Sequence, residues 1–279
     1  MPSVGRAGIW IEIGSTRLLE RTHDVCNTGF NFSQAQPPNG QQAMQGRKSY
    51  SPDVNPDPHW LIKHAALSYA NQWFVTDRVF MKKLKAEGSL CIDADILGAL
   101  AAKYMVARGF KKDAKKPKST ARWVKAAALL EAAATSTQPV HEAVRALATS
   151  LGRVAPARDT ESTLLSAATK FLWFAGRHEV RILDARAVNA LSEFSGESGL
   201  GCDYHRYSTA WNKHFKEHQS QIKSAIALLP AHLEWTSIPL DEHGNARRAF
   251  KHHWFVERVF DKYLWTVGTS GRGSATSFV

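Results

Sequence analysis

Apolar residues recur at helical spacing along most of the chain, and this pattern predicts a mainly α protein with at most a few short strands. Residues 6–13, RAGIWIEI, alternate well enough to predict one short strand. The stretch from 59 to 87 contains neither Pro nor Gly, which predicts one long helix or a broken pair. The other expected helices cover residues 89–108, about 120–135, 139–151, about 160–175, about 203–229 and about 246–266.

These elements divide the chain into four parts. Residues 1–58 combine the strand with a long polar arm rich in Asn, Gln, Pro, Gly and Ser. Helical subdomains are expected at 59–152 and 153–267. Residues 268–279, which are low in complexity, predict a flexible tail.

One short sequence occurs twice in similar form. WFVTDRVF at 73–80 resembles WFVERVF at 254–260, with one residue missing in the second copy. Shared helix packing or chance explains this similarity better than duplication does.

Candidate chemistry gathers between residues 166 and 191. A helix carrying Lys170 ends in a basic connection, and a short extended run over 180–183 then leads to Asp184. Asp184 precedes ARAVNAL, a good helix start, where an aspartate side chain caps the backbone N–H groups. Lys170 and Asp184 are therefore expected to come together. Asp93 is a second predicted N-cap, and Asp159 or Thr160 is predicted to cap the helix that carries the lysine.

The faces of the lysine helix leave two interpretations open. Leu164, Ala168, Phe171 and Ala175 recur at spacings of 4, 3 and 4 and predict the core face. Lys170, Trp173 and Arg177 then project from another face, where Trp173 would stack on a nucleic-acid base. The alternative places Trp173 in the core and Lys170 in solvent.

The charge balance favours a polyanionic partner. Lys and Arg number 36 against 25 for Asp and Glu, which gives a formal net charge of +11 and a pI near 9.7. Such an excess is typical of proteins that bind DNA or RNA. Binding to a membrane or an acidic protein, or a chain that is simply basic, are the alternatives.

The predicted helix at 203–229 combines an apolar stripe with a basic face. Tyr204 and Tyr207 near its start would line the mouth of a base pocket, although core packing explains them equally well. The basic face predicts a track for a phosphate backbone, or else an ordinary solvated face. Its residues are Arg206, Lys213, Lys216 and Lys223.

Lys170 and Asp184 have a chemical reason to act together. Cleavage of an N-glycosidic bond passes through a transition state resembling an oxocarbenium ion, which a carboxylate stabilises. An amine can attack the sugar carbon and form a Schiff base. A carboxylate that caps a helix can also face a cleft, so the two roles of Asp184 are compatible.

This stretch resembles the helix-hairpin-helix DNA glycosylases, in particular their 8-oxoguanine branch. Thr169–Lys170, a basic connection and apolar–Asp184–Ala–Arg–Ala–Val carry the resemblance, which covers about residues 150–195. Two features differ from that family: RVAPARDTEST has no glycine hairpin, and the Lys-to-Asp separation of 14 positions is about one helical turn shorter. Bacterial anti-phage glycosylases that remove glucosylated hydroxymethylcytosine are another possible relative.

The resemblance implies a multi-helix DNA-glycosylase-like fold and an enzyme that flips a base, modified or not, into a pocket. Asp184 would be the catalytic aspartate and Lys170 the Schiff-base lysine, with Trp173, Tyr204 and Tyr207 around the base. Double-stranded DNA is the expected partner, and no cofactor is needed. The expected DNA contacts are Arg177, His178, Arg181, Arg186 and the basic face of 203–229. A non-catalytic nucleic-acid-binding module and a helical protein-interaction factor are the alternative functions.

Other features exclude some classes. The chain lacks a Walker loop, a GxGxxG turn, a GxSxG elbow and HExxH, which argues against nucleotide cofactors and several hydrolase families. Cys202, His205, His214 and His218 do not match a common zinc spacing, so no metal is expected. Three widely separated cysteines indicate reduced cysteine usage, and no apolar run approaches a membrane span. A cytoplasmic monomer is the expectation.

Overall fold

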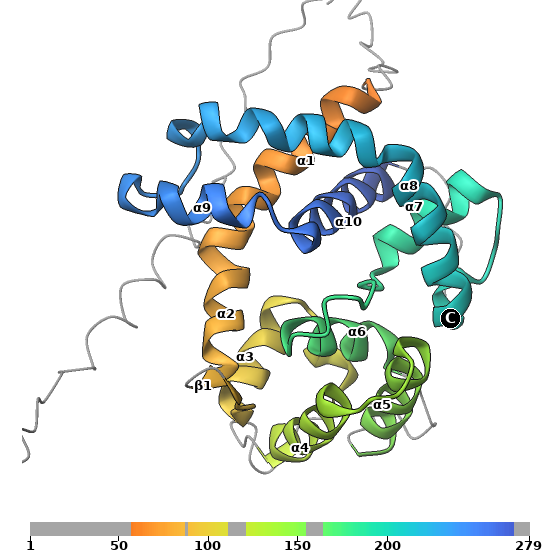
Figure 1. Ribbon diagram of the computed structural model, residues 1–279. Coiled ribbons are helices and arrows are strands. Elements are labelled where there is room, and N and C mark those ends of the chain that lie inside the picture. Colours follow the sequence, from red (N-terminus) through yellow and green to blue (C-terminus); the bar gives the residue numbers. More distant parts are fainter. Residues whose placement is uncertain (1–56, 87–88, 111–120, 155–163, 271–279) are drawn as a thin grey trace, which may run out of the picture. The chain divides into compact units, whose positions relative to one another are not determined.

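The computed structural model describes residues 57–86, 89–110, 121–154 and 164–270 (Figure 1). The predicted strand at 6–13, the polar arm, the caps at Asp159 and Thr160, and all of the predicted tail beyond residue 270 lie outside these ranges. The described part is mainly α. Its strands are two residues each, with Lys85–Ala86 (β1) paired antiparallel to Ser89–Leu90 (β2).

Most predicted helices occur with similar bounds. The helices are α1 Pro58–Gln72, α2 Arg78–Lys83, α3 Ala94–Lys103, α4 Ala121–Thr135, α5 Val140–Val154, α6 Leu165–Phe174, α7 Ala185–Ser195, α8 Tyr204–Leu228, α9 His243–Ala249 and α10 His253–Ser270. Two predictions differ from the structure. The helix expected at 89–108 is shorter, because residues 89–90 form β2 and α3 ends at Lys103. The helix expected at about 246–266 is divided by turns at 250–252, which separate α9 from α10.

Aspartate N-caps fix where several helices begin. Asp93 accepts from the backbone N–H groups of residues 95 and 96, and Asp203 does the same for residues 205 and 206. Asp184 accepts from the backbone N–H of Arg186 at 3.1 Å. These bonds satisfy donors that a helix start otherwise leaves unpaired. The caps predicted at Asp93 and Asp184 are therefore confirmed.

Helix α6 is surrounded by the other helices. Every residue from Ala167 to Phe174 is buried, including Thr169 and Lys170. It packs against α4 and α5, while α10 packs against α1, α7 and α8 (Figure 1). The buried residues of both groups form one continuous hydrophobic core. That core spans the two helical subdomains expected from the sequence.

The first of the two similar sequences begins with an irregular turn. Trp73–Asp77 is π-helical and joins α1 to α2. Such turns are rare and occur mostly as single bulges within α-helices. The turn leaves Asp77 fully buried.

Helix α10 approaches the start of α7 very closely. A Cβ atom added to Gly268 would overlap the backbone of Arg186. Glycine is therefore required at position 268 for this crossing. The crossing brings the middle of α10 beside Asp184, and both line the pocket described below.

Candidate functional site

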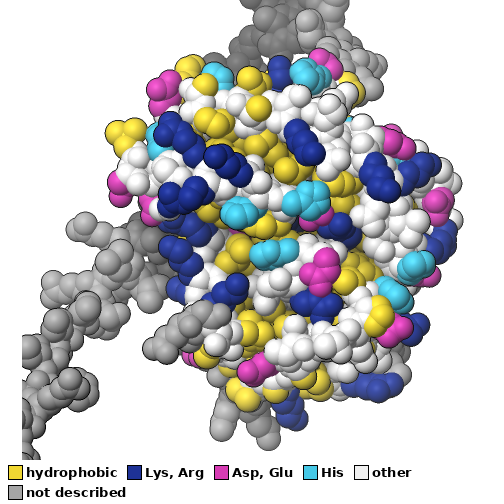
Figure 2. Space-filling view, viewed as in Figure 1, with side chains coloured by type: hydrophobic (Ala, Val, Ile, Leu, Met, Phe, Trp, Pro, Cys, Tyr) yellow, Lys and Arg dark blue, Asp and Glu magenta, His cyan; other side chains and the backbone are white. Residues whose placement is uncertain are grey.

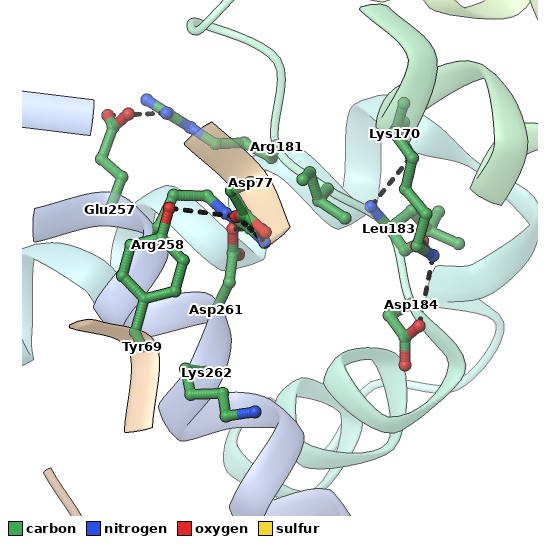
Figure 3. A network of polar contacts seen from close by, with 12 residues as sticks. Tyr69, Asp77, Lys170, Arg181, Leu183, Asp184, Glu257, Arg258, Asp261 and Lys262 are labelled. Carbon is green, nitrogen blue, oxygen red and sulfur yellow. Dashed lines mark hydrogen bonds and ion pairs between the residues drawn. The ribbon is translucent and has the colours of Figure 1, made fainter. Parts of the chain in front are cut away.

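Lys170 and Asp184 meet as the sequence predicts. The Lys170 ammonium lies 3.2 Å from Oδ2 of Asp184 (Figure 3). It also donates to Ser166 Oγ at 2.7 Å and to the backbone carbonyl of Leu183 at 3.3 Å. The Lys170 side chain is 4% exposed and that of Asp184 is 33% exposed. The lysine is thus held inside the protein, and the carboxylate faces outward beside it.

The extended segment before Asp184 is held by hydroxyl groups. The backbone N–H of Arg181 donates to Tyr204 Oη at 2.8 Å, and Tyr207 Oη donates to the carbonyl of Ile182 at 2.7 Å. The backbone N–H of Leu183 donates to Thr169 Oγ1 at 3.1 Å. Three successive residues are thereby fixed to α8 and α6. Their attachment sets the position of Asp184 against Lys170.

Burial lowers the pKa of Lys170 from its ordinary value of 10.5, although the nearby Asp184 carboxylate opposes this change. Removal from water disfavours the charged form of an amine. A lowered pKa increases the fraction of neutral amine at a given pH. That neutral form is the nucleophile in amine chemistry.

A pocket of about 480 Å³ opens beside this pair. This volume lies within the range of about 300–1,000 Å³ that is typical of ligand sites. Its wall comes from α1, the π turn, α3, α6, α7, α10 and the segments that follow α3 and precede α7. The lining residues are Tyr69, Asn71, Gln72, Val75, Thr76, Lys103, Tyr104, Met105, Lys170, Ile182, Asp184, Ala187, Arg258, Asp261, Lys262 and Trp265.

Buried charges lie at one wall of the pocket, which Arg258 and Asp261 line, and Figure 3 shows their contacts. Arg258 lies 2.8 Å from Asp261 and 3.7 Å from Asp77. Asp77 also accepts from the hydroxyls of Tyr69 and Tyr104. Burial raises the pKa of Asp261, and Arg258 opposes this rise. Charges removed from water in this way require several partners each, which rigidifies the wall.

The remaining polar groups join this wall to the rim. Gln72 donates to Asp77 at 3.3 Å and accepts from Lys262 at 3.3 Å. Lys262 lies 4.7 Å above the ring of Trp265, and the guanidinium of Arg186 lies 3.9 Å from the centre of the same ring. Trp265 is 37% exposed and lines the pocket. An aromatic ring flanked by cations therefore stands at the pocket.

The three side chains predicted to surround a base are placed elsewhere. Trp173 is 1% exposed, and its ring packs between Phe174, His178 and the Arg258 guanidinium. Tyr204 and Tyr207 are buried with their hydroxyls on the extended segment. None of the three lines the pocket. These three side chains pack in the protein interior next to the site, because α6 and the start of α8 are enclosed by neighbouring helices.

The basic connection after α6 is tied into the protein. Arg177 donates to the carbonyls of Ser136 at 3.0 Å and Gln138 at 3.3 Å, and so holds the turn between α4 and α5. Arg181 pairs with Glu257 at 2.6 Å and lies over a tryptophan ring. Both guanidinium groups therefore have structural partners, and their expected contact with nucleic acid stays a prediction.

The other predicted contacts differ in exposure. His178 is half-buried against two tryptophan rings, and burial lowers its pKa. Arg206 pairs with Glu197 at 3.1 Å on the surface. Lys213, Lys216 and Lys223 are exposed along α8, so their phosphate-binding role is sterically allowed and stays a prediction.

Residues that α1, α3 and α10 bring to the pocket were not predicted from the sequence. Arg258 and Asp261 lie on α10, far along the chain from Asp77 in the π-helical turn, and the patterns of these segments indicate only packing. One signal for Asp77 and Arg258 was present. The two similar sequences at 73–80 and 254–260 carry them at neighbouring positions of the repeat, and the structure places both in one cluster.

No group of three or more His, Cys, Asp or Glu residues suited to a metal ion occurs within 57–86, 89–110, 121–154 and 164–270. Among the helices that the structure describes, none is long and apolar enough to cross a membrane. No protein-family model matches the chain, and comparisons with curated proteins and with solved structures give no match either. The functional argument therefore depends on the geometry of the site.

Proposed function

We propose that the protein is a DNA N-glycosylase that excises a base flipped into the pocket beside Lys170 and Asp184. The observation that carries this proposal is the buried Lys170 amine, 3.2 Å from a carboxylate on the wall of a pocket of about 480 Å³. An amine and a carboxylate at one pocket suit cleavage of a bond at a sugar carbon. The formal net charge of +11 suits a polyanionic substrate.

The two residues have separate roles in the proposed reaction. The bond between the sugar C1′ and the base nitrogen breaks, and the base leaves with the bonding electrons and takes up a proton. Asp184 stabilises the positive charge that develops on the sugar. Neutral Lys170 forms a bond to C1′ and releases one N–H proton, which balances the proton taken up by the base. Opening of the sugar ring, with the second N–H proton passing to O4′, then gives a Schiff base. Where water attacks C1′ instead, Lys170 only binds and orients the substrate.

The pocket has groups that would recognise a flipped nucleotide. Gln72 and Tyr104 line the pocket and are bonded to each other and to Asp77, and we propose that they exchange these bonds for contacts with the edge of an extruded base. The ring of Trp265 is partly exposed, and a base would stack on it by displacing Arg186 or Lys262. We include glucosylated hydroxymethylcytosine among the candidate bases, because the resemblance in the sequence includes anti-phage glycosylases that remove it. If the protein removes this base, we propose that its substrate is phage DNA.

The test uses duplexes carrying normal bases, 8-oxoguanine or glucosylated hydroxymethylcytosine, incubated with the protein and then treated with alkali to cut abasic sites. Wild type is expected to yield cut strands on at least one duplex, and Asp184→Asn to reduce the rate by 100-fold or more, in line with the loss of one charge-stabilising group, which costs about 10²–10³. Asp203→Asn is the matched control, because Asp203 also caps a helix but lies outside the pocket lining. The control should retain wild-type activity.

Borohydride trapping separates the two roles of Lys170. Wild type is expected to form a covalent adduct with the cut substrate, and Lys170→Gln to form none. An adduct in the variant would contradict the nucleophilic role of Lys170. Tight DNA binding by wild type with no abasic sites on any duplex would overturn the proposed function in favour of a non-catalytic binding module.

A further inference from the structure

A second pocket, of about 490 Å³, lies where α2, β1, α9 and the start of α10 meet. Its lining residues are Trp73, Arg78, Met81, Lys82, Lys85, Asn245, Arg248, Ala249, His252 and Trp254. It shares no lining residue with the pocket beside Lys170. Figure 2 shows Lys and Arg side chains gathered on the surface over α9 and α2. We call this site the basic pocket.

Four cationic side chains line the basic pocket, and its lining residues include no carboxylate. Arg78, Lys82, Lys85 and Arg248 come from three different elements. Glu242 neutralises Arg78 in part through contacts of 2.6 and 3.1 Å. Lys82, Lys85 and Arg248 are exposed. Cations from separate elements that converge on one concavity raise the local concentration of anions.

Aromatic rings form another side of the basic pocket. The rings of His252 and Trp254 are stacked, with an interplanar angle of 14° and centroids 5.8 Å apart. Behind them, His178 lies 5.9 Å from Trp254. Burial lowers the pKa of His178, and the nearby Lys85 ammonium lowers it further, while Glu179 opposes this change. The stack therefore ends at an exposed histidine beside the cations.

We infer that the basic pocket binds a strand of nucleic acid, with backbone phosphates on Lys82, Lys85 and Arg248 and a base against the His252–Trp254 stack. Cations next to aromatic rings are the combination that single-stranded nucleic acid requires, because phosphates need charge and unstacked bases need a flat surface. A single free phosphate is much smaller than 490 Å³ and would use only part of this lining. The inference does not require that the protein excises bases.

The experiment measures binding of a fluorescent single-stranded oligonucleotide by anisotropy over a range of salt concentrations. Lys82→Glu/Arg248→Glu changes two exposed side chains of the basic pocket. Lys125→Glu/Arg145→Glu is the control, because it changes the net charge equally on the exposed surfaces of α4 and α5, outside both pockets. Circular dichroism and thermal unfolding establish that both variants fold.

The variant of the basic pocket is expected to weaken binding at low salt by more than about tenfold and to reduce the slope of log K against log salt by about 1.4, about 0.7 for each lost contact with a single strand. The control is expected to change affinity by less than about threefold. Equal weakening in both variants, or no weakening in either, would overturn the inference.

A second arm distinguishes nucleic acid from a lipid surface. Vesicles of phosphatidylcholine with phosphatidylserine are mixed with the same variants and sedimented. Binding to vesicles that requires Lys82 and Arg248, together with oligonucleotide binding that does not, would also overturn the inference. If no base is excised but oligonucleotide binding still depends on the basic pocket, the proposed enzyme activity is rejected and the proposed binding site is retained.

Discussion

Replacing Arg258 by methionine removes the cation at the centre of the buried wall. Arg258 lies 2.8 Å from Asp261 and 3.7 Å from Asp77, and its side chain is only 7% exposed. Asp77 keeps hydrogen bonds from Tyr69 and Tyr104 after the change, whereas Asp261 keeps only the one from Trp211 at 2.7 Å among those that the structure describes. The main penalty therefore falls on Asp261.

Removing one partner of a buried ion pair costs about 3–5 kcal/mol, because the remaining charge is left largely desolvated and without compensation. Burial already raises the pKa of Asp261 above its ordinary value of 3.8. Arg258→Met should raise that pKa further. When the pKa of a carboxyl group is higher in the folded protein than in the unfolded chain, the protein loses stability as the pH rises above the pKa of the unfolded chain. The loss in Arg258→Met is therefore expected to be larger at pH 7 than at pH 5.

The assay is urea unfolding followed by circular dichroism at both pH values, with the free energy of unfolding obtained by linear extrapolation. Arg258→Met/Asp261→Asn is the matched variant, because asparagine can still accept from Trp211 without a charge. It is expected to recover part of the lost stability. If Arg258→Met lowers the free energy of unfolding by less than about 1 kcal/mol at pH 7, which is the range of exposed ion pairs, the assignment of this cluster as a buried ion pair is refuted. Failure of the double variant to exceed Arg258→Met would refute the assigned role of Asp261.

Two further predictions concern the support of the site and the basic face of α8. Tyr207→Phe removes the 2.7 Å hydrogen bond to the carbonyl of Ile182. The free energy of unfolding, measured in urea, should fall by about 1–3 kcal/mol because a buried acceptor loses its partner. The rate of base excision should also fall, and an unchanged rate would show that this bond does not position Asp184. Lys213→Glu/Lys216→Glu on α8 should weaken duplex binding and reduce the slope of log K against log salt by about two if these exposed lysines contact phosphates. If this variant binds as tightly as Lys125→Glu/Arg145→Glu, the two lysines belong to a solvated face.

Local sequence patterns predicted much of the secondary structure. The N-caps at Asp93 and Asp184 occur as expected, because the short side chain of aspartate bonds to its own helix start and needs no distant partner. The meeting of Lys170 and Asp184 was also predictable, since only 14 positions separate them and a short extended run must return along the helix. Interactions of this range are determined by neighbouring residues.

Helix α6 marks the limit of that reasoning. Its apolar spacing left two interpretations open, with Trp173 either stacked on a base or packed in the core while Lys170 lies in solvent, and each is wrong for one of these two residues. The structure buries both faces, because α4 and α5 cover one side and the extended segment with α10 covers the other. A helix with apolar residues all round is buried, but the sequence does not say which helices enclose it.

Most helices, their aspartate caps and the contact between Lys170 and Asp184 follow from the amino-acid sequence alone, because each depends on residues close together in the chain. That this contact faces a pocket, which Arg258 and Asp261 line and Asp77 supports, follows only from the packing of the helices. Those charges come from helices whose own patterns indicate packing alone. Their burial becomes acceptable only when α1 and α10 pack together and each charge gains its partners, and this depends on the packing of distant segments.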